Sequence, residues 1–465
     1  MLTREQAHDI FLRLRRHTSC DEVELTIGGG ASALTRFANN GITQNVAEEN
    51  YSLSVRVNLD GRTARATTNK TDDESLRRVV SQAEALARVQ QRDTDLLPMP
   101  GQREVESQAS TLHLQSPNRF FAATAAITAS DRAVQVERMV AAAKKNNLTA
   151  AGTYASGKQV EGVFNSRGVT QWHQQTSAEA SITMIGATSS GWQKAHSPDA
   201  ADFDAAHLAE TAAEKARLSA NPKEIPAGKY TVILEPAAVL DLVGFMFWDF
   251  GGLALLDQRS FLNNRMGTQL FGEEITISDD VYHPLQSGLP FDGEGMRRRK
   301  VALVQKGVPQ QVVYARASAE LMTKSDLVSK VGRVEVTGHG FPLPNEMGEA
   351  PMNVVFAPPK NPRTVQEMVK STERGILVTR LWYIREVEPY EKILTGMTRD
   401  GTFLVENGKV QCGVRNFRFN QGLIHLLTNV EAMSMPVRAS GEESFDMVVP
   451  AMKVRDFNFT EVTRF

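Results

Sequence analysis

The sequence predicts an α+β protein, in which an N-terminal region of helices and antiparallel strands is followed by a β-rich C-terminal domain with a few helices. Three observations indicate this class. Apolar residues recur at helical spacing over 73–90 and 131–146. Polar and apolar residues alternate, as in half-buried strands, over Glu22–Ile27 and Tyr51–Asn58. From about Gly228 onward, most periodic segments have strand character.

The chain is long enough, at 465 residues, for two or three domains. Two segments have the composition of linkers: Asp93–Ser110, which contains two prolines and a glycine, and a second segment that starts at Asn221-Pro222. We therefore expect an N-terminal α+β domain over 1–95, a central α+β region over 96–225 and a β-rich C-terminal domain over 226–465.

The first domain is predicted to begin with a helix, in which Thr3 is the N-cap and Gln6 occupies the capping-box position. The strand after this helix is expected to end in a turn at Gly28–Gly30, because glycine favours positive φ. Asp60-Gly61 is a hairpin signal between two strands. Strands are predicted over 22–27, 33–37, 44–46, 51–58 and 62–67, and a second helix over 73–90.

The central region is predicted to repeat the order of helix, strands and helix. Turns are expected at Ser156-Gly157 and Ser166–Gly168, and a Gly/Ser-rich loop over Gly186–Trp192. The repeated order suggests a degenerate duplication, although no sequence repeat is visible. The predicted helices cover 131–146 and 202–219, and the predicted strands cover 151–156, 160–165, 169–175 and 178–185.

The C-terminal domain is predicted to contain strands and three short helices. Ala237–Phe250 is strongly apolar at helical spacing, and Asn407-Gly408 is a tight turn between two strands. The remaining predicted helices cover 366–374 and 423–433, and the predicted strands cover 229–234, 273–281, 299–306, 375–383, 401–406, 409–414 and 449–459.

Bulk composition excludes several classes of function. The net charge of −2 gives no whole-molecule attraction for nucleic acid or anionic membranes. The two cysteines, Cys20 and Cys412, exclude a disulfide framework and a four-cysteine zinc site. The N-terminal residues lack a secretory pattern, and apolar stretches such as Val239–Phe250 are too short to span a bilayer. We expect a cytoplasmic protein.

The nine histidines form no metal-binding motif. None lies in an HExxH or HExxxH pair, the spacings that place two imidazoles on one helix face. His339, in a glycine-containing loop with Glu346, is a candidate for a lone ligand or base, and a polar loop residue is the alternative. A GxSxG nucleophile elbow and a phosphate-binding loop are also absent from the sequence.

Three charged clusters are further candidates. Asp279-Asp280 and the Asp292/Glu294 pair are candidates for a cation site, and solvated turns are the alternative. The basic run Arg297–Lys300 is the one nucleic-acid candidate. Because acidic residues lie close to it in the sequence, a local salt-bridged turn is the favoured interpretation.

A series of motifs in the C-terminal half resembles the TldD/PmbA (TldE) family, once called modulators of DNA gyrase. The resemblance extends over about 230–460, and residues 1–220 agree with the helix-and-sheet N-terminal region of that family. Because the motifs occur in the family's order, chance similarity is a poor explanation. The motifs are Ser260–Gly267, Ile275–Asp280, Pro290–Met296, Val304–Val308, Gly375–Tyr383 and Gly396–Gly408.

The resemblance implies a two-subunit peptidase. TldD-type chains carry HExxxH on a helix early in the C-terminal domain, together with a distant cysteine, and bind zinc. PmbA/TldE-type chains lack these residues and pair with TldD. The complex is expected to cleave small or unfolded peptides, including peptide-antibiotic precursors and antitoxins. It therefore matters which of the two types this sequence matches.

The residues of this chain match the PmbA/TldE type. The helix that would carry the zinc motif, Val239–Gly252, contains neither His nor Glu. The stretch that would supply the cysteine is Gly441–Met447, and Cys412 lies on an earlier predicted strand. Zinc hydrolysis needs three protein ligands, an open position and a carboxylate base. We expect no catalytic and no metal-binding residue in this chain, and zinc only in a TldD-like partner.

The same helix gains a cluster of large apolar side chains, which are candidates either for the core or for an interface anchor. Partners implied by the resemblance are a TldD-like zinc subunit and extended peptides that add a strand to a sheet edge. A homodimer of the isolated chain is also plausible by family symmetry. The candidate interface or cleft residues are Phe245, Phe247, Trp248, Arg265, Asp292, Glu294 and His339.

The main hypothesis is thus a non-catalytic subunit of a zinc peptidase complex. The first alternative is an independent hydrolase with an unrecognised site, built from His339 with Glu346 or Asp292. The second alternative is a gyrase- or DNA-associated binding protein, which the near-zero net charge disfavours.

Overall fold

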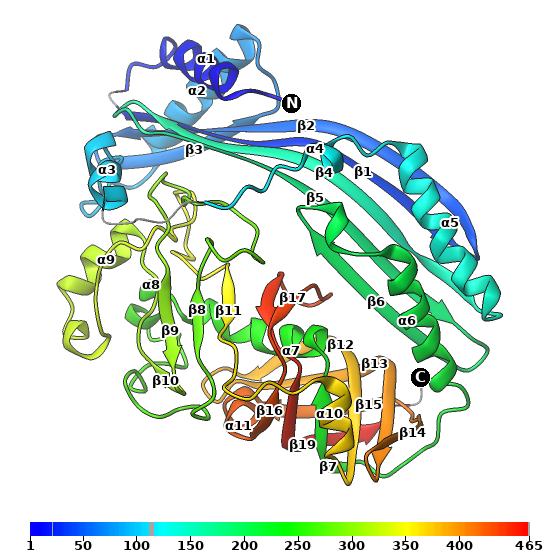
Figure 1. Cartoon of the computed structure of the whole chain (residues 1–465). Helices are drawn as coiled ribbons and strands as arrows, with labels where there is room; N and C mark the ends of the chain where they lie inside the picture. Colours follow the sequence, from blue (N-terminus) through cyan, green and yellow to red (C-terminus); the bar gives the residue numbers. More distant parts are fainter. Residues whose placement is uncertain (21, 111–115, 464–465) are drawn as a thin grey trace.

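The computed structural model describes residues 1–20, 22–110 and 116–463, and its architecture confirms the predicted α+β class. The described strands form three sheets. A six-stranded sheet, with helices on its outer face, arches over a C-terminal half that contains the other two sheets (Figure 1). The N-terminal half therefore forms a layer of its own above the β-rich C-terminal half.

The first sheet is antiparallel and has the order β3-β2-β1-β4-β5-β6. The predicted hairpin at Asp60-Gly61 is confirmed, because Leu59 of β2 lies opposite Arg62 of β3. The strands are β1 Glu22–Ala38, β2 Gly41–Leu59, β3 Arg62–Thr68, β4 Thr149–Asn165, β5 Thr170–Ile185 and β6 Ser190–Ser197.

Two predicted turns are wrong, so β1, β2 and β4 are longer than expected. Gly28–Gly30 lies within β1, and Ser156-Gly157 lies within β4. Gly29 has a φ of +134°, and a Cβ atom there would lie 2.2 Å from the backbone oxygen of Asn50 on β2. The glycines therefore allow neighbouring strands to approach closely, which is a second common reason for glycine in a strand. The predicted loop over 186–192 is also too long, because β6 begins at Ser190.

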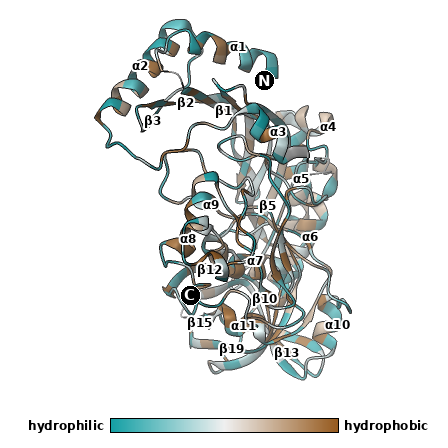
Figure 2. Ribbon diagram, turned by 90° about the vertical axis from the view of Figure 1, so that its left-hand side faces the viewer, coloured by the Kyte–Doolittle hydropathy of each residue, from teal (hydrophilic) through white to brown (hydrophobic). Residues whose placement is uncertain are grey.

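Four helices cover the outer face of this sheet. Helices α1 and α2 pack on one half and α5 and α6 on the other, each pair over its own apolar core. The capping box of Thr3 and Gln6 is confirmed. In Figure 2, α1 and α2 carry both teal and brown segments, as amphipathic helices do. The helices are α1 Arg4–Arg15, α2 Asp73–Val89, α5 Ala129–Lys145 and α6 Ala205–Leu218.

The order helix, three strands, helix occurs twice, as α1-β1-β2-β3-α2 and as α5-β4-β5-β6-α6. Strands β1 and β4 pair in the centre of the sheet, so the strand order is symmetric about them. This arrangement is what the hypothesised duplication would produce. The segment between the halves contains α3 Gln102–Ser110 and α4 Ala122–Ala125, so the linker predicted over 93–110 ends in a helix. The domain boundaries at 95 and 225 stay predictions.

The C-terminal half is built on two further sheets. The second has the order β10-β9-β8-β11-β18-β17. The third closes on itself through the pairings β12–β7, β7–β19, β19–β15, β15–β13 and β13–β12. Their strands are β7 Gly228–Leu234, β8 Ile277–Asp279, β9 Val301–Gln305, β10 Val308–Pro309, β11 Val354–Phe356, β12 Arg374–Glu388, β13 Ile393–Glu406, β14 Lys409–Gly413, β15 Phe417–Gly422, β16 Val430–Met433, β17 Val437–Ala439, β18 Met447–Val449 and β19 Met452–Val462.

Several predicted C-terminal elements are shorter than expected. The helix predicted over 237–250 becomes the α-helix α7 Pro236–Val243 followed by the 3-10 helix η2 Gly244–Asp249. The helix predicted over 423–433 ends at Thr428, and β16 follows it. Only 277–279 of the strand predicted over 273–281 forms a strand. The other helical segments are η1 Ala200–Asp202, α8 Gly252–Leu256, α9 Arg316–Thr323, η3 Val328–Lys330, α10 Val365–Lys370 and α11 Leu423–Thr428.

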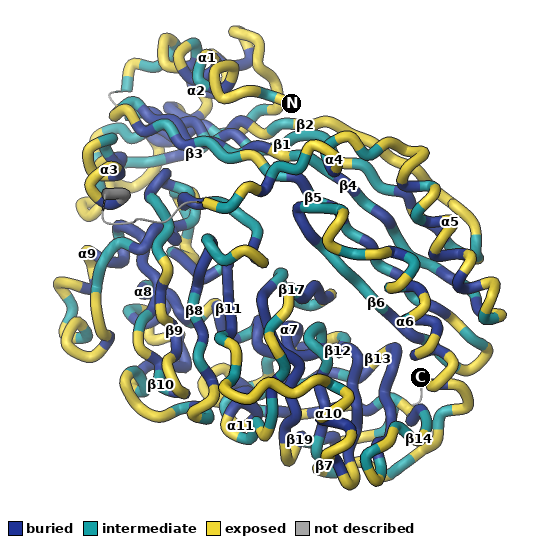
Figure 3. Tube along the Cα trace, viewed as in Figure 1, coloured by how far each residue is buried: buried dark blue, intermediate teal, exposed yellow. Residues whose placement is uncertain are grey.

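The strands of the C-terminal half form the largest apolar core (Figure 3). Phe417 and Phe459 stack there with ring centroids 4.6 Å apart, and Phe457 lies 5.0 Å from Phe459. Within residues 1–20, 22–110 and 116–463, we find no helix that is both long and apolar enough to cross a membrane.

Replacing Gly29 with alanine is expected to destabilise the first sheet, because the new Cβ would meet the Asn50 oxygen at 2.2 Å and the residue would keep a φ of +134°. We expect a loss of about 2 kcal/mol or more, in line with the cost of strained backbone. Urea unfolding measures the loss, and Gly101→Ala is the matched control, because a Cβ at Gly101 meets nothing within 4 Å. Equal midpoints for both variants would contradict this account of Gly29.

Candidate functional site

The two segments that the family resemblance assigns to zinc ligation lie against each other. The Asp241 side chain on α7 accepts hydrogen bonds from the backbone N–H groups of Glu442 (3.2 Å) and Glu443 (3.0 Å). α7 begins with Pro236 at its first turn, which supplies the φ that a helix needs, and its buried residues pack into the C-terminal core. The two stretches that the resemblance aligns with ligand positions are therefore neighbours, although their sequence separation is about 200 residues.

The contact between these stretches is close enough to require small residues. A Cβ atom at Gly441 would lie 2.2 Å from Asp241 Oδ1, and a Cβ atom at Gly244 would lie 1.9 Å from Ser444 Oγ. Side chains of any size on either glycine would therefore push the segments apart. Where the resemblance places zinc ligands in TldD-type chains, this chain places direct packing of helix against loop.

Asp241 is fully buried, and burial raises its pKa to about 7. The two backbone N–H donors oppose this shift, whereas the nearby Glu443 carboxylate adds to it. Asp241 Oδ2 is buried and has no hydrogen-bond partner. A lone carboxyl with these properties is half-protonated near neutral pH and is a weak metal ligand, because ligation requires the ionised form.

The first sheet holds the same loop from the other side. Lys194 on β6 donates to the Gly441 carbonyl (3.1 Å) and pairs with Glu442 (3.7 Å). His196 Nδ1, two residues along β6, pairs with Asp446 Oδ2, and Ser440 Oγ donates to Asp446 Oδ1 (2.7 Å). The loop 440–446 is thus clamped between β6 and α7.

Asp446 keeps its charge in this clamp. Burial alone would raise its pKa, but the contacts to His196, Ser440 and Lys194 outweigh burial and lower the pKa below the ordinary value. The clamp borders a hollow of about 550 Å³ on the inner face of the first sheet. Its walls include Arg36, Gln44, Ser177, Glu179 and His196. The site therefore offers polar groups to a ligand in the hollow.

The aromatic cluster predicted for the helix divides between core and surface. Phe247 is fully buried, and Phe245 is partly buried against the same core. Trp248 is 44% exposed, and its ring centroid lies 6.2 Å from that of Phe341. Of the three candidates, Trp248 is the one whose side chain remains available at the surface.

Arg265 lies outside this site. Its guanidinium stacks 3.7 Å over the Tyr390 ring, donates to the Tyr390 carbonyl (2.8 Å) and pairs with Glu391. It therefore ties the segment after α8 to the turn between β12 and β13.

The predicted cation candidates Asp279, Asp280, Asp292 and Glu294 do not lie in solvated turns, because all four are buried. Asp292 accepts backbone N–H bonds from Glu294 (3.0 Å), Met296 (2.9 Å) and Gly340 (3.0 Å), so its carboxyl organises its own loop. Burial and the neighbouring Glu294 raise the pKa of Asp292.

His339 is buried and both of its ring nitrogens are engaged. Nε2 contacts Asp279 Oδ1 (2.9 Å), and Nδ1 contacts the Thr337 carbonyl and hydroxyl (3.0 Å each). Burial lowers the pKa of His339. Burial would raise the pKa of Asp279, but His339 and the Asn353 N–H more than offset it and lower that pKa. Glu346 is exposed, so the structure does not bring the predicted His339–Glu346 pair together.

The basic run forms ion pairs, but not the local salt-bridged turn that the sequence favoured. Arg299 pairs with Glu335 (3.1 Å), and Lys300 pairs with Asp280 (2.9 Å). Arg298 donates to the Asn353 side chain (3.0 Å). The acidic partners come from other segments and are not the carboxylates next to the run.

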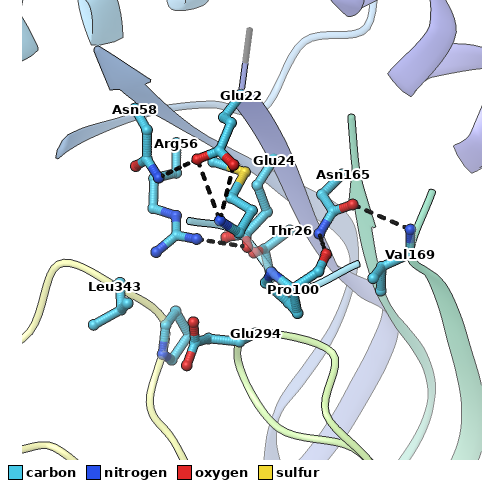
Figure 4. Close-up of polar contacts among 12 residues, drawn as sticks. Glu22, Glu24, Thr26, Arg56, Asn58, Pro100, Asn165, Val169, Glu294 and Leu343 are labelled. Carbon is cyan, nitrogen blue, oxygen red and sulfur yellow. Dashed lines mark hydrogen bonds and ion pairs between the residues drawn. The ribbon is translucent and has the colours of Figure 1, made fainter. Parts of the chain in front are cut away.

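A buried charge network joins the first sheet to the C-terminal half, and Figure 4 shows its Glu24–Arg56 pair with Leu343 and Glu294 of the C-terminal half nearby. Glu24 on β1 pairs with Arg56 (3.2 Å) and Arg65 (2.7 Å), and Arg65 also donates to the Leu343 carbonyl (2.7 Å). Glu294 faces this group in Figure 4.

A third guanidinium group extends the network from the C-terminal side. Arg316 on α9 pairs with Glu294 (3.2 Å) and with Glu104 (2.8 Å), and donates to the Pro98 carbonyl (2.9 Å). Burial raises the pKa of Glu294, and the guanidinium groups of Arg316 and Arg56 oppose that shift. Sequence reasoning found Glu294 but missed Glu24, Arg316, Asp241 and His196, because their partners lie far away in the sequence.

A search of the residues that the structure describes finds no group of three or more His, Cys, Asp or Glu side chains placed to hold a metal ion. Cys20 and Cys412 are free thiols of intermediate exposure on separate parts of the molecule. At the site itself, Asp241 accepts two backbone N–H groups. The carboxylates of the loop have other partners: Glu442 pairs with Lys194, Glu443 accepts the Tyr383 N–H, and Asp446 pairs with His196. The donor set does not fit a tetrahedral zinc site, which needs at least three protein ligands.

Comparison with family models gives three matches that together cover most of the chain. They are described as PmbA/TldA metallopeptidase domain 1, over 23–87, the central domain, over 120–220, and the C-terminal domain, over 227–461.

Individual relatives give a consistent result. The chain is 24% identical over 449 residues to a protein of Escherichia coli O157:H7 named metalloprotease PmbA, covering 93% of this chain and 91% of that protein. It is 34% identical over 175 residues to an uncharacterized protein of Methanocaldococcus jannaschii, covering 36% of this chain and 41% of that protein. The crystal structure of TldE from Thermococcus kodakarensis shares the fold, with a TM-score of 0.83 at 18% identity over 98% of this chain and 99% of the other.

Replacing Asp241 with asparagine is expected to stabilise the protein at neutral and alkaline pH. The folded chain holds the Asp241 proton up to about pH 7, whereas the unfolded carboxyl releases it near pH 4. The group therefore removes stability as pH rises from about 4 to 7. The gain of Asp241→Asn should be near zero at pH 4 and reach on the order of a few kcal/mol above pH 7.

Thermal unfolding from pH 4 to pH 9 measures this difference. Asparagine keeps an acceptor for the two N–H groups, and the exposed Asp326→Asn is the control for removing a carboxylate. A gain that is the same at every pH, or that falls as pH rises, would show that Asp241 does not hold its proton in the folded chain.

Removing Arg316 is expected to lower the free energy of unfolding, because Glu294 would remain buried without its cation. We expect Arg316→Met to cost about 3–5 kcal/mol, as for other broken buried pairs. Combining it with Glu294→Gln should restore part of the loss, since no unpaired charge then remains. Urea midpoints of the two single variants and the double variant test this. Additive losses would mean that the two side chains do not interact.

Proposed function

Because the chain belongs to the PmbA/TldD family, the PmbA/TldA metallopeptidases, we propose that it acts as a non-catalytic subunit of the PmbA/TldE type. In this role it pairs, in the cytoplasm, with a TldD-like zinc peptidase subunit. The complex cleaves small or unfolded peptides, and the zinc and the general base belong to the partner.

The contact between α7 and the loop 440–446 carries this proposal. Zinc peptidases need three protein ligands, a position for water and a carboxylate that takes the proton from that water. In this chain the two segments that correspond to the ligand positions pack through Gly244 and Gly441, and their carboxylates are already engaged, Asp241 by two N–H groups and Asp446 by His196. Neither an imidazole nor a thiolate comes from these segments, since both lack His and Cys.

The surface near this site supports a role in assembly. Trp248 is 44% exposed beside Phe341, and Tyr383, whose N–H donates to Glu443 (2.6 Å), is 53% exposed. Exposed aromatic side chains of this kind dominate the energetics of protein interfaces. A partner that covers them would also cover the loop next to the packed site.

The inner face of the first sheet supports a role in peptide binding. The hollow of about 550 Å³ lies on this face and reaches His196, the residue that pairs with Asp446. The polar side chains in its walls suit the backbone of an extended peptide, which presents N–H and C=O groups along its whole length. A peptide held there would be read mainly through its backbone, which suits unfolded substrates of varied sequence.

Neither alternative function has comparable support. An independent hydrolase built on His339 would need a free ring nitrogen, but Asp279 and Thr337 engage both nitrogens. Binding to DNA through Arg297–Lys300 would compete with the ion pairs of Arg299 and Lys300. Both alternatives would therefore begin by breaking existing contacts.

Co-expression with a TldD-like chain tests the proposal. We expect the two chains to co-purify, zinc to be present at about one ion per pair, and an unfolded peptide to be cleaved by the pair. This chain alone should bind no stoichiometric zinc and cleave no peptide, because it lacks the ligand set. Elemental analysis and mass spectrometry of the peptide products measure these outcomes.

The variant His339→Ala separates this proposal from the hydrolase alternative. Zinc bound by the isolated chain, with peptide cleavage that His339→Ala abolishes while thermal unfolding remains cooperative, would disprove the non-catalytic role. Failure of the two chains to co-purify at micromolar concentration would disprove the pairing.

A further inference from the structure

The hollow on the inner face of the first sheet has a charged side chain of each sign at its two ends. Side chains at alternate positions of a strand share one face of the sheet. Phe37 of β1 lies in the core under the helices, so Ser32 and Arg36 lie on the opposite, inner face. On β2, Glu48 lies opposite Ser32 and Gln44 lies opposite Arg36. These inner-face residues of β1 and β2 line the hollow.

The charges of Arg36 and Glu48 are free. Both residues are exposed. Among the residues that the structure describes, the Arg36 guanidinium has no ion pair and no hydrogen bond. The Glu48 carboxylate has one long contact, with the Ser32 hydroxyl (3.4 Å). Each charge is therefore available to a ligand.

The other titratable side chains of the hollow already have partners. Glu179 pairs with Lys194 (3.4 Å), and His196 pairs with Asp446. These pairs lie on the β6 side of the hollow, whereas the free charges lie on the β1 and β2 side. A ligand with charged groups is therefore expected to lie along β1 and β2.

The spacing of the two free charges matches a short extended peptide. Ser32 and Arg36 are four residues apart on β1, which places their Cα atoms about 13 Å apart. Glu48 lies on the neighbouring strand at the Ser32 end. An extended peptide spans about 3.3–3.6 Å per residue. A peptide of about four residues would thus place one terminus at each charge.

The floor between the two charges is apolar. Leu34 lies opposite Val46 on one side and Ala155 on the other. All three line the hollow, and Val46 is 38% exposed. The volume of about 550 Å³ lies within the range of small-ligand sites, which is about 300–1,000 Å³. A ligand of that size ends inside the hollow, so the two charges face its ends.

We propose that the hollow binds a short peptide with two free ends, about four residues long, with its ammonium group at Glu48 and its carboxylate at Arg36. An apolar side chain in the middle of the peptide packs on Leu34, and the Gln44 amide is placed to donate to the carboxylate. This inference rests on the peptide-binding role proposed above for the inner face. It narrows the ligand of this surface from unfolded chains in general to short free peptides.

Calorimetric titration of the purified full chain with the tetrapeptide Ala-Leu-Leu-Ala tests the proposal. We expect binding with a Kd of about 1 mM or tighter at low salt. Acetylating the N-terminus and amidating the C-terminus should each weaken binding by about fivefold, because each removes one ion pair. The dipeptide Leu-Leu should bind more weakly than the tetrapeptide, because it cannot reach both charges.

Charge variants assign each end of the peptide. Arg36→Gln should weaken binding by about fivefold and abolish the effect of amidation, while the effect of acetylation remains. Glu48→Gln should abolish the effect of acetylation only. The matched controls are Arg15→Gln on α1 and Glu74→Gln on α2, exposed residues of the outer helices, which should leave binding unchanged. The blocked peptides give the same test on the wild-type chain if a variant fails to fold.

Photo-crosslinking locates the bound peptide. A tetrapeptide with a photoreactive phenylalanine in the middle should crosslink to fragments that contain Leu34, Val46 or Ala155. Crosslinks confined to other parts of the chain would overturn the proposal, as would the absence of tetrapeptide binding at about 10 mM. Equal binding of the free and the doubly blocked tetrapeptide would also overturn it, because the termini would then not be recognised.

The result is separable from the proposed peptidase role. A complex with a TldD-like chain that contains zinc and cleaves peptides, formed by a protein that binds no tetrapeptide on its own, would overturn this inference and leave the proposed function intact. Tetrapeptide binding by a chain that does not pair with a TldD-like subunit would have the opposite meaning.

Discussion

The cost of burying charge on the inner face of the first sheet determines how the two halves of the molecule fit together. One face of that sheet is apolar and is covered by helices, but the other carries charged side chains that the C-terminal half buries. We call the contact between the first sheet and the C-terminal half the seam. Glu24, Arg56 and Arg65 lie at one end of the seam, and Lys194 and His196 lie at the other. A buried charge is tolerated only when a partner and hydrogen bonds accompany it. The relative position of the halves is therefore set by a few points where charges must meet, and the loop 440–446 is one of them.

Contacts between distant segments, such as those at the seam, also limit which parts of the structure can be predicted from the sequence. Helices α2 and α5 and the Asp60-Gly61 hairpin depend on local periodicity and turn chemistry, which one sequence reveals. The turn expected at Gly28–Gly30 is wrong because glycine serves close packing between strands as well as turns. Periodicity also cannot show that η2 departs from α7 at Gly244, the residue that packs against Ser444. Local signals identify elements, whereas contacts between distant segments determine where those elements end.

The candidate site was predictable in location but not in chemistry. Family resemblance identified the two stretches that meet, and the residues within them excluded a zinc peptidase centre. It did not identify Asp241 as the residue that joins them, since an aspartate in an apolar helix has no special sequence signal. The same limit applies to His339, which the glycine-rich loop marked as a candidate. Its Asp279 partner comes 60 residues earlier, and together they form a buried pair rather than an open site.

The unusual length of β1 and β2 shapes both the inner face and the outer edge of the first sheet. β1 runs through Gly28–Gly30 without turning, and β2, which is 19 residues long, pairs with it along almost its whole length, whereas β3 has only 7 residues. The difference in length leaves the far half of β2 without an outer neighbour, which creates the free edge. The same extension carries the sheet beyond the Glu24 end of the seam toward β6, which creates the polar hollow beside His196. A turn at the three glycines would remove both features. The glycines that appear to interrupt a strand in the sequence are thus what allows the sheet to continue into both the hollow and the free edge.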